Sequence, residues 1–283
     1  MALSALNSLD KTTFVQLRDL IYEKTGISFS ENKTYLLENR LKRRLEDCGC
    51  GNFEEYYYLL KYDSRRNQEL THLYNSVTTN ETSFFRDAVQ IKAFYDDILP
   101  LVAKQNREKG INEIKVWSAA SSTGEEAYTM AMQIVNQKLP QAGFKIDIAA
   151  SDLSEQVVEA AKKGIYGKNA VRNVPPEYMS RYFKNGGDTY EVLPEIKEMV
   201  SFSNMNLLDS ARMRSMRNMD IILCRNVLIY FDDKAKKTVI SNLYDSLRPG
   251  GYLFIGYSES LHNISRSFKL EHFNRALVYK KEA

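Results

Sequence analysis

The chain has 283 residues, of which 43% are apolar and 27% are charged. At the usual size of a domain this length suggests two domains, with enough apolar residues for at least one full core. The 39 lysines and arginines against 36 aspartates and glutamates leave a net charge of +3, which is too small for a dedicated nucleic-acid-binding protein.

Residues 1–79 predict a small all-helical domain. Four stretches carry apolar residues at the three- and four-residue spacing of a helix, and few strand patterns interrupt them. We expect the first helix to be capped by Thr12 or Thr13. Residues 80–90 are expected to link this domain to the next, and their phenylalanines indicate a packed connection rather than a flexible one.

Short apolar runs alternate with helical patterns over residues 91–283, which predicts an α/β domain. The expected strands are 114–118, 144–150, 219–224, 252–256 and an edge strand at 276–280. The expected helices are 125–137, 154–163 and one that begins after a cap at Asp232 or Asp233. Alternation of this kind argues for a parallel sheet with right-handed connections, and we therefore expect a Rossmann-like fold.

A tight-turn sequence, Asn-Gly-Gly-Asp at 185–188, does not fit this simple alternation. Because it lies between two short runs of strand-forming residues, we predict a small antiparallel β-subdomain inserted at about 182–203. An ordinary surface excursion would carry the same signal.

The loop after the first expected strand reads Ser-Ala-Ala-Ser-Ser-Thr-Gly-Glu-Glu over residues 118–126. In open α/β sheets, ligands bind at such loops, beyond the carboxyl ends of the strands. A dinucleotide site would need several glycines so that the backbone could approach a pyrophosphate, but only Gly124 is present. Glu125 and Glu126 would repel a phosphate and attract an ammonium or sulfonium group. Alternatively, the two glutamates only stabilise the dipole of the following helix.

Asp152 follows the second expected strand. An acidic side chain at this place in a βαβ unit can accept hydrogen bonds from both hydroxyls of a ribose. A lone aspartate after a strand is more often a helix cap, and both roles stay open. Together with the glycine-poor first loop, the ribose interpretation predicts adenosine bound without phosphate contacts, which points to S-adenosylmethionine.

Arg225 and Asn226 interrupt the most apolar stretch of the chain, directly after the expected strand 219–224. Buried polar groups cost about 1–3 kcal/mol each unless they are paired. Asn226 is therefore predicted to contact a ligand or to belong to an internal hydrogen-bond network.

The sequence does not indicate disulfide bonds, a metal site or a membrane-spanning segment. Three cysteines are an odd count, and Cys48 and Cys50 are too close for an ordinary bridge. No second cysteine pair stands at the spacing of zinc ligands, and the three histidines are scattered, so we predict no metal site. No apolar run approaches the about 20 residues of a membrane-spanning helix, and the N-terminus lacks a signal-peptide pattern. We expect a cytoplasmic protein that does not insert into a membrane.

Four motifs together resemble one family. The stretches TTNETSFFRD (78–87), VWSAASSTGEE (116–126), NLLD (206–209) and CRNVLIYFD (224–232) closely resemble the CheR family of bacterial chemotaxis protein-glutamate methyltransferases. The resemblance covers essentially the whole chain in the right order. It implies that methyl groups pass from S-adenosylmethionine to glutamate side chains of methyl-accepting chemoreceptors, with S-adenosylhomocysteine as the product. We further expect a monomer with no nucleic-acid partner.

The resemblance also implies a cofactor cleft. Its walls would contain Asn80, Thr82, Arg86, Glu125, Asp152, Asn206, Leu207, Asn226 and Val227. Asp152 would hold the ribose, and Glu125 would face the ammonium group of the methionine. Arg86 and Tyr230 would lie near the transferred methyl group and orient the acceptor carboxylate. For Arg86 a structural role stays open, as a salt bridge that ties the linker to the domain.

Methylation of a carboxylate agrees with this set of residues. A glutamate side chain has a pKa near about 4.3, so it is an anion at neutral pH and needs no general base. This accounts for a predicted cleft without histidine or cysteine. The main catalytic task is then to align oxygen, methyl and sulfur, and Arg86 is expected to position the carboxylate rather than to transfer a proton.

Basic residues on one helix are candidates for substrate docking. Arg40, Lys42, Arg43 and Arg44 lie on the helix whose apolar face carries three leucines, and the resemblance implies that they dock on acidic receptor helices. A solvated charged face is the alternative. The turn at 185–188 looks shorter than in relatives that bind a receptor tail, so we do not expect the β-subdomain to bind one.

Two other functions stay open from the sequence. One is a related methyltransferase of a non-motility chemosensory pathway. The other is a non-enzymatic scaffold that binds S-adenosylmethionine and docks a partner. Transfer of a labelled methyl group to a receptor fragment would separate an enzyme from a scaffold.

Overall fold

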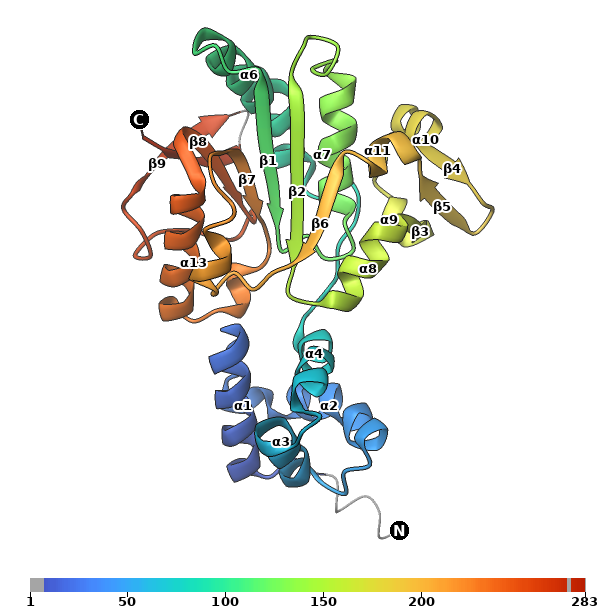
Figure 1. Ribbon diagram of the computed structural model, residues 1–283, viewed down its shortest axis with the longest axis vertical. Helices are drawn as coiled ribbons and strands as arrows, with labels where there is room; N and C mark the ends of the chain where they lie inside the picture. Colours follow the sequence, from blue (N-terminus) through green and yellow to red (C-terminus); the bar gives the residue numbers. More distant parts are fainter. Residues whose placement is uncertain (1–7, 274–275, 283) are drawn as a thin grey trace.

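The computed structural model describes residues 8–273 and 276–282 (Figure 1). Helices α1–α4 form an N-terminal domain at one end of the molecule, and a sheet domain with helices on both faces fills the rest. The helices of the first domain are α1 Lys11–Thr25, α2 Thr34–Cys48, α3 Phe53–Tyr62 and α4 Arg66–Val77, with a short 3-10 helix, η1 Glu31–Lys33, before α2. Their apolar faces share one core, which confirms the predicted all-helical domain.

Helix α1 is capped by an aspartate and not by a threonine. The Asp10 carboxylate accepts hydrogen bonds from the backbone N–H groups of Thr12 and Thr13, at 2.9 and 3.0 Å. Both threonines lie inside the first turn, so their predicted role as caps is wrong. Gly26, with a φ of 73°, ends the helix in the left-handed conformation that favours glycine.

A seven-stranded sheet forms the centre of the second domain, in the order β6-β2-β1-β7-β8-β10-β9. The first five strands of this order are parallel, and β10 and β9 complete the sheet in antiparallel pairing. The strands are β1 Glu113–Ala119, β2 Lys145–Asp152, β6 Val200–Asn204, β7 Met219–Cys224, β8 Leu247–Ile255, β9 Phe268–Phe273 and β10 Ala276–Lys281. The main helices on its faces are α5 Ala88–Ala93, α6 Leu99–Glu108, α7 Glu125–Asn136, α8 Glu155–Lys163 and α13 Asp233–Ser246. This architecture confirms the predicted Rossmann-like fold.

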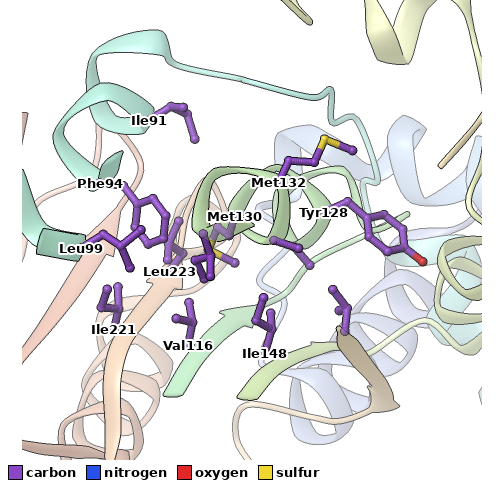
Figure 2. Packing of buried hydrophobic residues seen from close by; sticks show 14 of the residues in the cluster. Ile91, Phe94, Leu99, Val116, Tyr128, Met130, Met132, Ile148, Ile221 and Leu223 are labelled. Carbon is purple, nitrogen blue, oxygen red and sulfur yellow. The ribbon is translucent and has the colours of Figure 1, made fainter. Parts of the chain in front are cut away.

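Alternate residues of the central strands point to opposite faces, so the sheet separates two cores. On one face, Val116 of β1 and Ile221 and Leu223 of β7 pack beneath residues of α5, α6 and α7, as Figure 2 shows. On the other face, Trp117 and Ile222 pack with α13. These five side chains are at most 1% exposed. This packing fixes the carboxyl ends of β1 and β7, from which the predicted site loops emerge.

The edges of the sheet differ from the prediction. The sequence predicts an edge strand at 276–280, but β10 lies between β8 and β9, and β9 itself is the edge. The sequence pattern does not predict β9 or β6. Both lie at an edge of the sheet, and among their residues only Val200 is buried, so neither carries the apolar run of a central strand.

A three-stranded antiparallel sheet, in the order β3-β5-β4, is inserted between α8 and β6. It consists of β3 Ile165–Gly167, α9 Lys168–Val171, α10 Pro176–Tyr182, β4 Phe183–Asn185, β5 Thr189–Val192 and α11 Pro194–Lys197. The β4–β5 hairpin confirms the turn predicted at 185–188. The predicted bounds of 182–203 are wrong at both ends, because β3 pairs with β5 from outside this range and β6 pairs with β2 in the main sheet.

The linker between the domains is packed, as its phenylalanines indicate. Phe84 is fully buried, and its ring lies edge-on to Tyr166 and Phe183 of the inserted subdomain at centroid distances of 4.8 and 5.0 Å. Phe85 contacts Tyr178 at a centroid distance of 4.8 Å. These contacts hold the linker at a fixed position beside the carboxyl ends of the strands.

Among residues 8–273 and 276–282, no helix has both the length and the apolar character needed to cross a lipid bilayer. These described residues also contain no cluster of three or more His, Cys, Asp or Glu side chains that could hold a metal ion. Cys48, Cys50 and Cys224 are free thiols.

Candidate active site

A cleft opens where the carboxyl ends of β1, β2 and β7 meet the linker and the end of α1. It encloses about 1050 Å³, including the space at its open mouth. Tyr230 and every predicted cofactor residue except Glu125 line it: Asn80, Thr82, Arg86, Asp152, Asn206, Leu207, Asn226 and Val227. The structure thus brings together motifs that lie far apart in the sequence.

The loop after β1 turns sharply without a glycine-rich sequence. Ala120 and Ser122 have φ values of 62° and 51°, a conformation that costs a non-glycine residue about 1–2 kcal/mol. The N–H group of Ser121 donates to the Ser151 carbonyl at 2.8 Å, and that of Ser122 donates to the Asp152 carboxylate at 2.8 Å. Because these N–H groups bond to the end of β2, they form no cradle for a phosphate.

Asp152 ends β2 and lies in the cleft wall. It is 7% exposed, and burial raises the pKa of its carboxyl group above the ordinary value. Its two oxygens accept the N–H groups of Ser122 at 2.8 Å and Ser154 at 3.0 Å. The N-cap of α8 is Ser154, whose hydroxyl accepts the Val157 N–H group. Asp152 therefore orders the loop after β1 and the loop after β2. Because each of its oxygens has a further lone pair, it can also accept hydrogen bonds from hydroxyl groups of a ligand.

The two glutamates at the start of α7 have different surroundings. Glu125 is buried, accepts the Thr123 hydroxyl at 2.7 Å and does not line the cleft. Glu126 does line it, and its oxygens accept the Ser118 hydroxyl at 2.7 Å and pair with Arg225 at 2.9 Å. The prediction of Glu125 in the cleft wall is therefore wrong, and Glu126 occupies that place. Consecutive helix residues point about 100° apart, so two adjacent side chains do not face the same wall.

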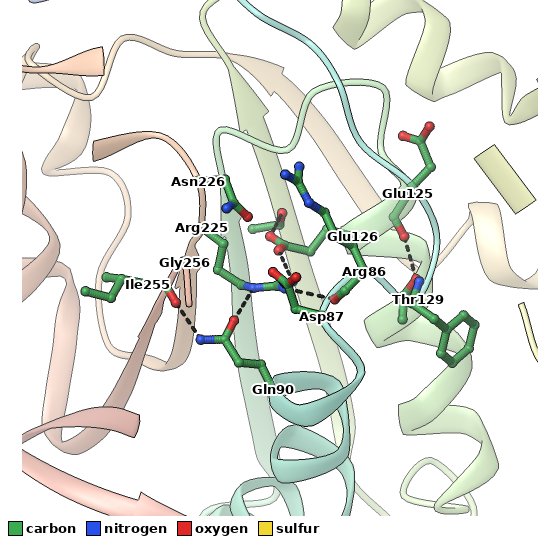
Figure 3. Close-up of polar contacts among 12 residues, drawn as sticks. Arg86, Asp87, Gln90, Glu125, Glu126, Thr129, Arg225, Asn226, Ile255 and Gly256 are labelled. Carbon is green, nitrogen blue, oxygen red and sulfur yellow. Dashed lines mark hydrogen bonds and ion pairs between the residues drawn. The ribbon is translucent and has the colours of Figure 1, made fainter. Parts of the chain in front are cut away.

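Arg225 is the centre of a buried hydrogen-bond network beside the cleft (Figure 3). Its side chain is 3% exposed. The guanidinium donates to Gln90 Oε1 at 2.7 Å and to the Glu126 carboxylate at 2.9 Å. It also donates to the Asp87 carboxylate at 2.7 Å and to the Arg86 carbonyl at 2.8 Å. The network ties the end of β7 to α7 and to the linker, and its bonds offset the cost of burying the charge.

Arg86 and Tyr230 both line the cleft, the first from the linker and the second from the loop after β7. The Arg86 guanidinium donates to the Glu81 carbonyl at 2.8 Å. In the part of the chain that the structure describes, Arg86 makes no ion pair, and the salt bridge between linker and domain is formed by Arg225 and Asp87 instead. The Arg86 charge therefore lies in the cleft without a carboxylate partner among the described residues.

The N-terminal domain contributes one wall of the cleft. Ile27, just after α1, lines it. The Ser28 N–H group donates to the Tyr230 carbonyl at 2.9 Å, and the Asn206 side chain donates to the Lys24 carbonyl at 2.7 Å. Asn206, a predicted cofactor residue, thus also joins the two domains.

Gln90 and Glu259 support the cleft from behind its walls, and the sequence does not single them out. Gln90 is 4% exposed and, besides its bond to Arg225, donates to the Ile255 carbonyl at 2.7 Å. Glu259 follows β8 and accepts the Gly256 N–H group at 2.6 Å. Gln90 is a polar residue on the apolar side of a short helix, which is only a weak sequence indication of a functional role. Glu259 lies in a short polar turn and carries no signal of its own.

Two of the four basic residues predicted to dock a substrate have partners inside the protein. The Arg44 side chain is 14% exposed and pairs with Glu69 at 2.7 Å and with Asp47 at 2.6 Å. Arg40 donates to the Thr79 hydroxyl of the linker at 2.6 Å. The structure therefore contradicts a freely projecting docking group at these two positions, because tertiary contacts already hold both guanidinium groups.

Lys42 and Arg43 are exposed on the outer face of α2. Lys42 pairs with Glu38 at 2.7 Å across one helical turn. Arg43 has no ion-pair partner among the residues described. Because an exposed pair contributes only about 0–1 kcal/mol, both cations can meet an acidic partner.

The groups in the cleft suit a nucleoside that carries positive charge and no phosphate. The carboxylates of Asp152 and Glu126 lie in its walls, and the first loop offers no phosphate cradle. The Ser121 hydroxyl oxygen is buried in the wall without a hydrogen-bond partner in the described structure, so a ligand can satisfy it. S-adenosylmethionine carries an adenosine, an ammonium and a sulfonium group. Fold and cleft together define an S-adenosylmethionine-dependent methyltransferase.

Comparisons with known proteins agree with this class. The family "CheR methyltransferase, SAM binding domain" matches residues 80–277, and "CheR methyltransferase, all-alpha domain" matches residues 12–78. The chain is 34% identical to chemotaxis protein methyltransferase 2 of Vibrio cholerae, over 95% of this chain and 93% of that protein. It is 35% identical to the chemotaxis protein methyltransferase of Escherichia coli, over 93% and 89% of the two chains. The chain belongs to the CheR methyltransferase family, and S-adenosylmethionine is its cofactor.

Proposed function

We propose that the protein transfers the methyl group of S-adenosylmethionine to glutamate side chains on the cytoplasmic helices of chemoreceptors, in the cytoplasm, as part of chemotaxis. The family and the names of its relatives support this class of substrate. One observation carries the choice of a carboxylate acceptor. Arg86 and Tyr230 line the same cleft as the cofactor residues, and among the described residues no histidine or cysteine lines it.

A carboxylate acceptor is consistent with cleft walls in which no described histidine or cysteine could act as a general base. An ordinary glutamate side chain has a pKa near about 4.3, so it reaches the cleft as an anion at neutral pH. When bound, the cofactor supplies an electrophilic methyl group on a positively charged sulfur. Opposite charges meet and disperse in such a reaction, so alignment of the reacting atoms contributes more than general base catalysis.

The protein's own part is to position the acceptor. The Arg86 guanidinium and the Tyr230 hydroxyl are donors that can hold its two oxygens. Each of these residues is anchored through its backbone, because the Arg86 carbonyl accepts from Arg225 and the Tyr230 carbonyl accepts from Ser28. Proximity and orientation of this kind lower the activation free energy by about 7–11 kcal/mol in favourable cases.

Transfer of labelled methyl groups tests the proposal. A receptor cytoplasmic fragment incubated with the protein and methyl-labelled S-adenosylmethionine should gain label that base releases as methanol, the behaviour of a glutamate methyl ester. Replacing the labelled glutamates by aspartate should abolish it. Absence of label at saturating cofactor, with S-adenosylhomocysteine still bound, would contradict the proposal and leave a cofactor-binding scaffold.

Replacing Arg86 should affect turnover more than cofactor binding. We expect Arg86→Ala to lower kcat by about a hundredfold, the effect of misplacing a reacting group by an ångström. Calorimetry should show a nearly unchanged Kd for S-adenosylhomocysteine. Arg172→Ala, at an exposed arginine of the inserted subdomain, is the matched control. Equal losses in kcat and affinity would make Arg86 a cofactor ligand only.

Substitutions at two neighbouring arginines of α2 should have different effects, one on receptor docking and the other on the stability of the fold. Arg43→Ala should raise the receptor KM, most strongly at low salt because screening shortens to about 8 Å at physiological ionic strength. Its free energy of unfolding should stay within about 0.5 kcal/mol of the wild type. Arg44→Ala should lower the free energy of unfolding by about 3 kcal/mol, because the buried Glu69 loses its cation. Urea unfolding measures the effect on stability, and KM at several salt concentrations measures the effect on docking. If the KM of Arg43→Ala exceeds the wild-type KM by the same factor at low and high salt, Arg43 has no electrostatic docking role.

A further inference from the structure

Glu259 joins the loops that follow β7 and β8. Its Oε2 accepts the Gly256 N–H group at 2.6 Å and the Asn226 N–H group at 3.0 Å. Its Oε1 accepts the Ile229 N–H group at 3.2 Å. Glu259 is not among the residues that line the cleft. It therefore acts on the cleft only through the backbone of its neighbours.

Secondary structure provides no acceptor for the two donors after β7. Asn226 has a φ of 60°, so the chain leaves the strand there in the left-handed conformation. Ile229 lies in the short 3-10 helix η3, Leu228–Tyr230, whose N-cap residue Val227 makes no side-chain capping bond. The Glu259 carboxylate supplies the acceptor that a capping side chain gives at the start of a helix.

Gly256 provides the space that this arrangement needs. A Cβ atom at this position would lie 2.7 Å from the Glu259 carboxylate and 2.8 Å from the Asn226 backbone nitrogen. Real Cβ atoms essentially never come so close to other heavy atoms, so a side chain here would push the two loops apart. On its other side, the Ile255 carbonyl accepts from Gln90, which belongs to the buried network around the cleft.

We propose that Glu259 is a positioning residue for methyl transfer. Through three backbone bonds it sets the place of Asn226 beside the cofactor and of Tyr230 beside the acceptor carboxylate, and the second part rests on the proposed methylation of glutamate. A carboxylate suits this task because a charged acceptor forms shorter and stronger hydrogen bonds than a neutral one. A glutamine would keep one oxygen and place an NH₂ group against a backbone donor.

Glu259→Gln tests the proposal through the separation of kcat from KM. At saturating cofactor, kcat should fall by about ten- to hundredfold, the range that follows from a displacement of up to an ångström. The Kd for S-adenosylhomocysteine should rise, whereas the receptor KM should stay near the wild-type value because the exposed face of α2 is unchanged. Glu195→Gln, at an exposed glutamate of α11, should match the wild type in all three measurements.

A merely structural role would give a different result. It would lower Tm and leave kcat at saturating cofactor unchanged, and this outcome overturns the proposal. The Kd for S-adenosylhomocysteine can be measured without a methyl-accepting receptor. An unchanged Kd in Glu259→Gln therefore overturns the inference about Glu259. A wild-type protein that methylates no receptor would instead contradict the proposed function.

Gly256→Ala disturbs the same contact, because the added Cβ atom would lie against the Glu259 carboxylate. It should reproduce the loss of kcat with an unchanged receptor KM, and the double variant should lose less than the two single effects combined, because both act on one contact. Additive effects would show that the two residues act separately and would overturn the proposal. If Glu259→Gln does not fold, Gly256→Ala and Glu259→Asp provide the test, and full kcat in both overturns it.

Discussion

Replacing Arg225 by methionine should lower the free energy of unfolding by about 3–5 kcal/mol, the usual cost of breaking a buried ion pair from one side. Methionine replaces the unbranched aliphatic stem of the arginine but removes every donor from the network. The carboxylates of Glu126 and Asp87 lose their shared cation, and the amide oxygen of Gln90 loses its donor. Because these residues hold α7 and the linker at the cleft, the folded variant should also bind S-adenosylhomocysteine more weakly. Urea unfolding and calorimetry measure the two effects.

Arg248→Met is the matched control for this substitution. Arg248 lies at the start of β8, away from the cleft, and pairs with the buried Asp220 at 2.9 Å. Its loss should cost a similar free energy of unfolding, since it also leaves a buried carboxylate unpaired. The Kd for S-adenosylhomocysteine should stay at the wild-type value. Wild-type affinity in Arg225→Met, or the same loss of affinity in both variants, would show that the network does not shape the cleft.

Central strands are the part of the fold that the sequence predicts best. The predicted strand 219–224 coincides with β7, Met219–Cys224, in which every residue is buried. Its neighbours on both sides exclude water, so the strand needs an unbroken apolar run. The edge strands β6 and β9 face solvent over most of their length, and their mixed sequences do not differ from those of loops.

Chain connectivity also decides part of the site. Asp152 ends β2 and Asn226 follows β7, and the carboxyl ends of parallel strands meet at one edge of the sheet, so the meeting of these two residues in one cleft follows from the fold. The choice between Glu125 and Glu126 depends instead on the rotation of α7 about its axis. A one-residue difference in where a helix begins changes that rotation, and the sequence does not set it.

Contacts between distant segments could not be predicted. Arg44 pairs with Glu69 from another helix, and the apolar pattern of α2 shows only which side of that helix is buried. Glu259 likewise reaches Asn226 from a loop on another strand. Such pairings depend on how elements pack, and neither propensity nor spacing along the chain encodes them directly.

Asp152→Ala should weaken the binding of S-adenosylhomocysteine at least about tenfold. A hydrogen bond to a charged group contributes about 1.5–3 kcal/mol, and about 1.4 kcal/mol corresponds to tenfold in affinity. Asp147→Ala, in the same strand but outside the cleft, is the control and should bind like the wild type. An unchanged Kd by calorimetry in Asp152→Ala would rule out the ribose role.

A second ligand separates a direct contact from an effect on the loops. Asp152 also accepts the N–H groups of Ser122 and Ser154, so its loss could weaken binding by loosening both turns. An analogue of S-adenosylhomocysteine without ribose hydroxyls should bind the wild type more weakly than the natural product does. Asp152→Ala should bind the two ligands with nearly equal affinity, because the group that distinguishes them is gone. If the variant still discriminates as strongly as the wild type, Asp152 orders the loops and a different group reads the ribose.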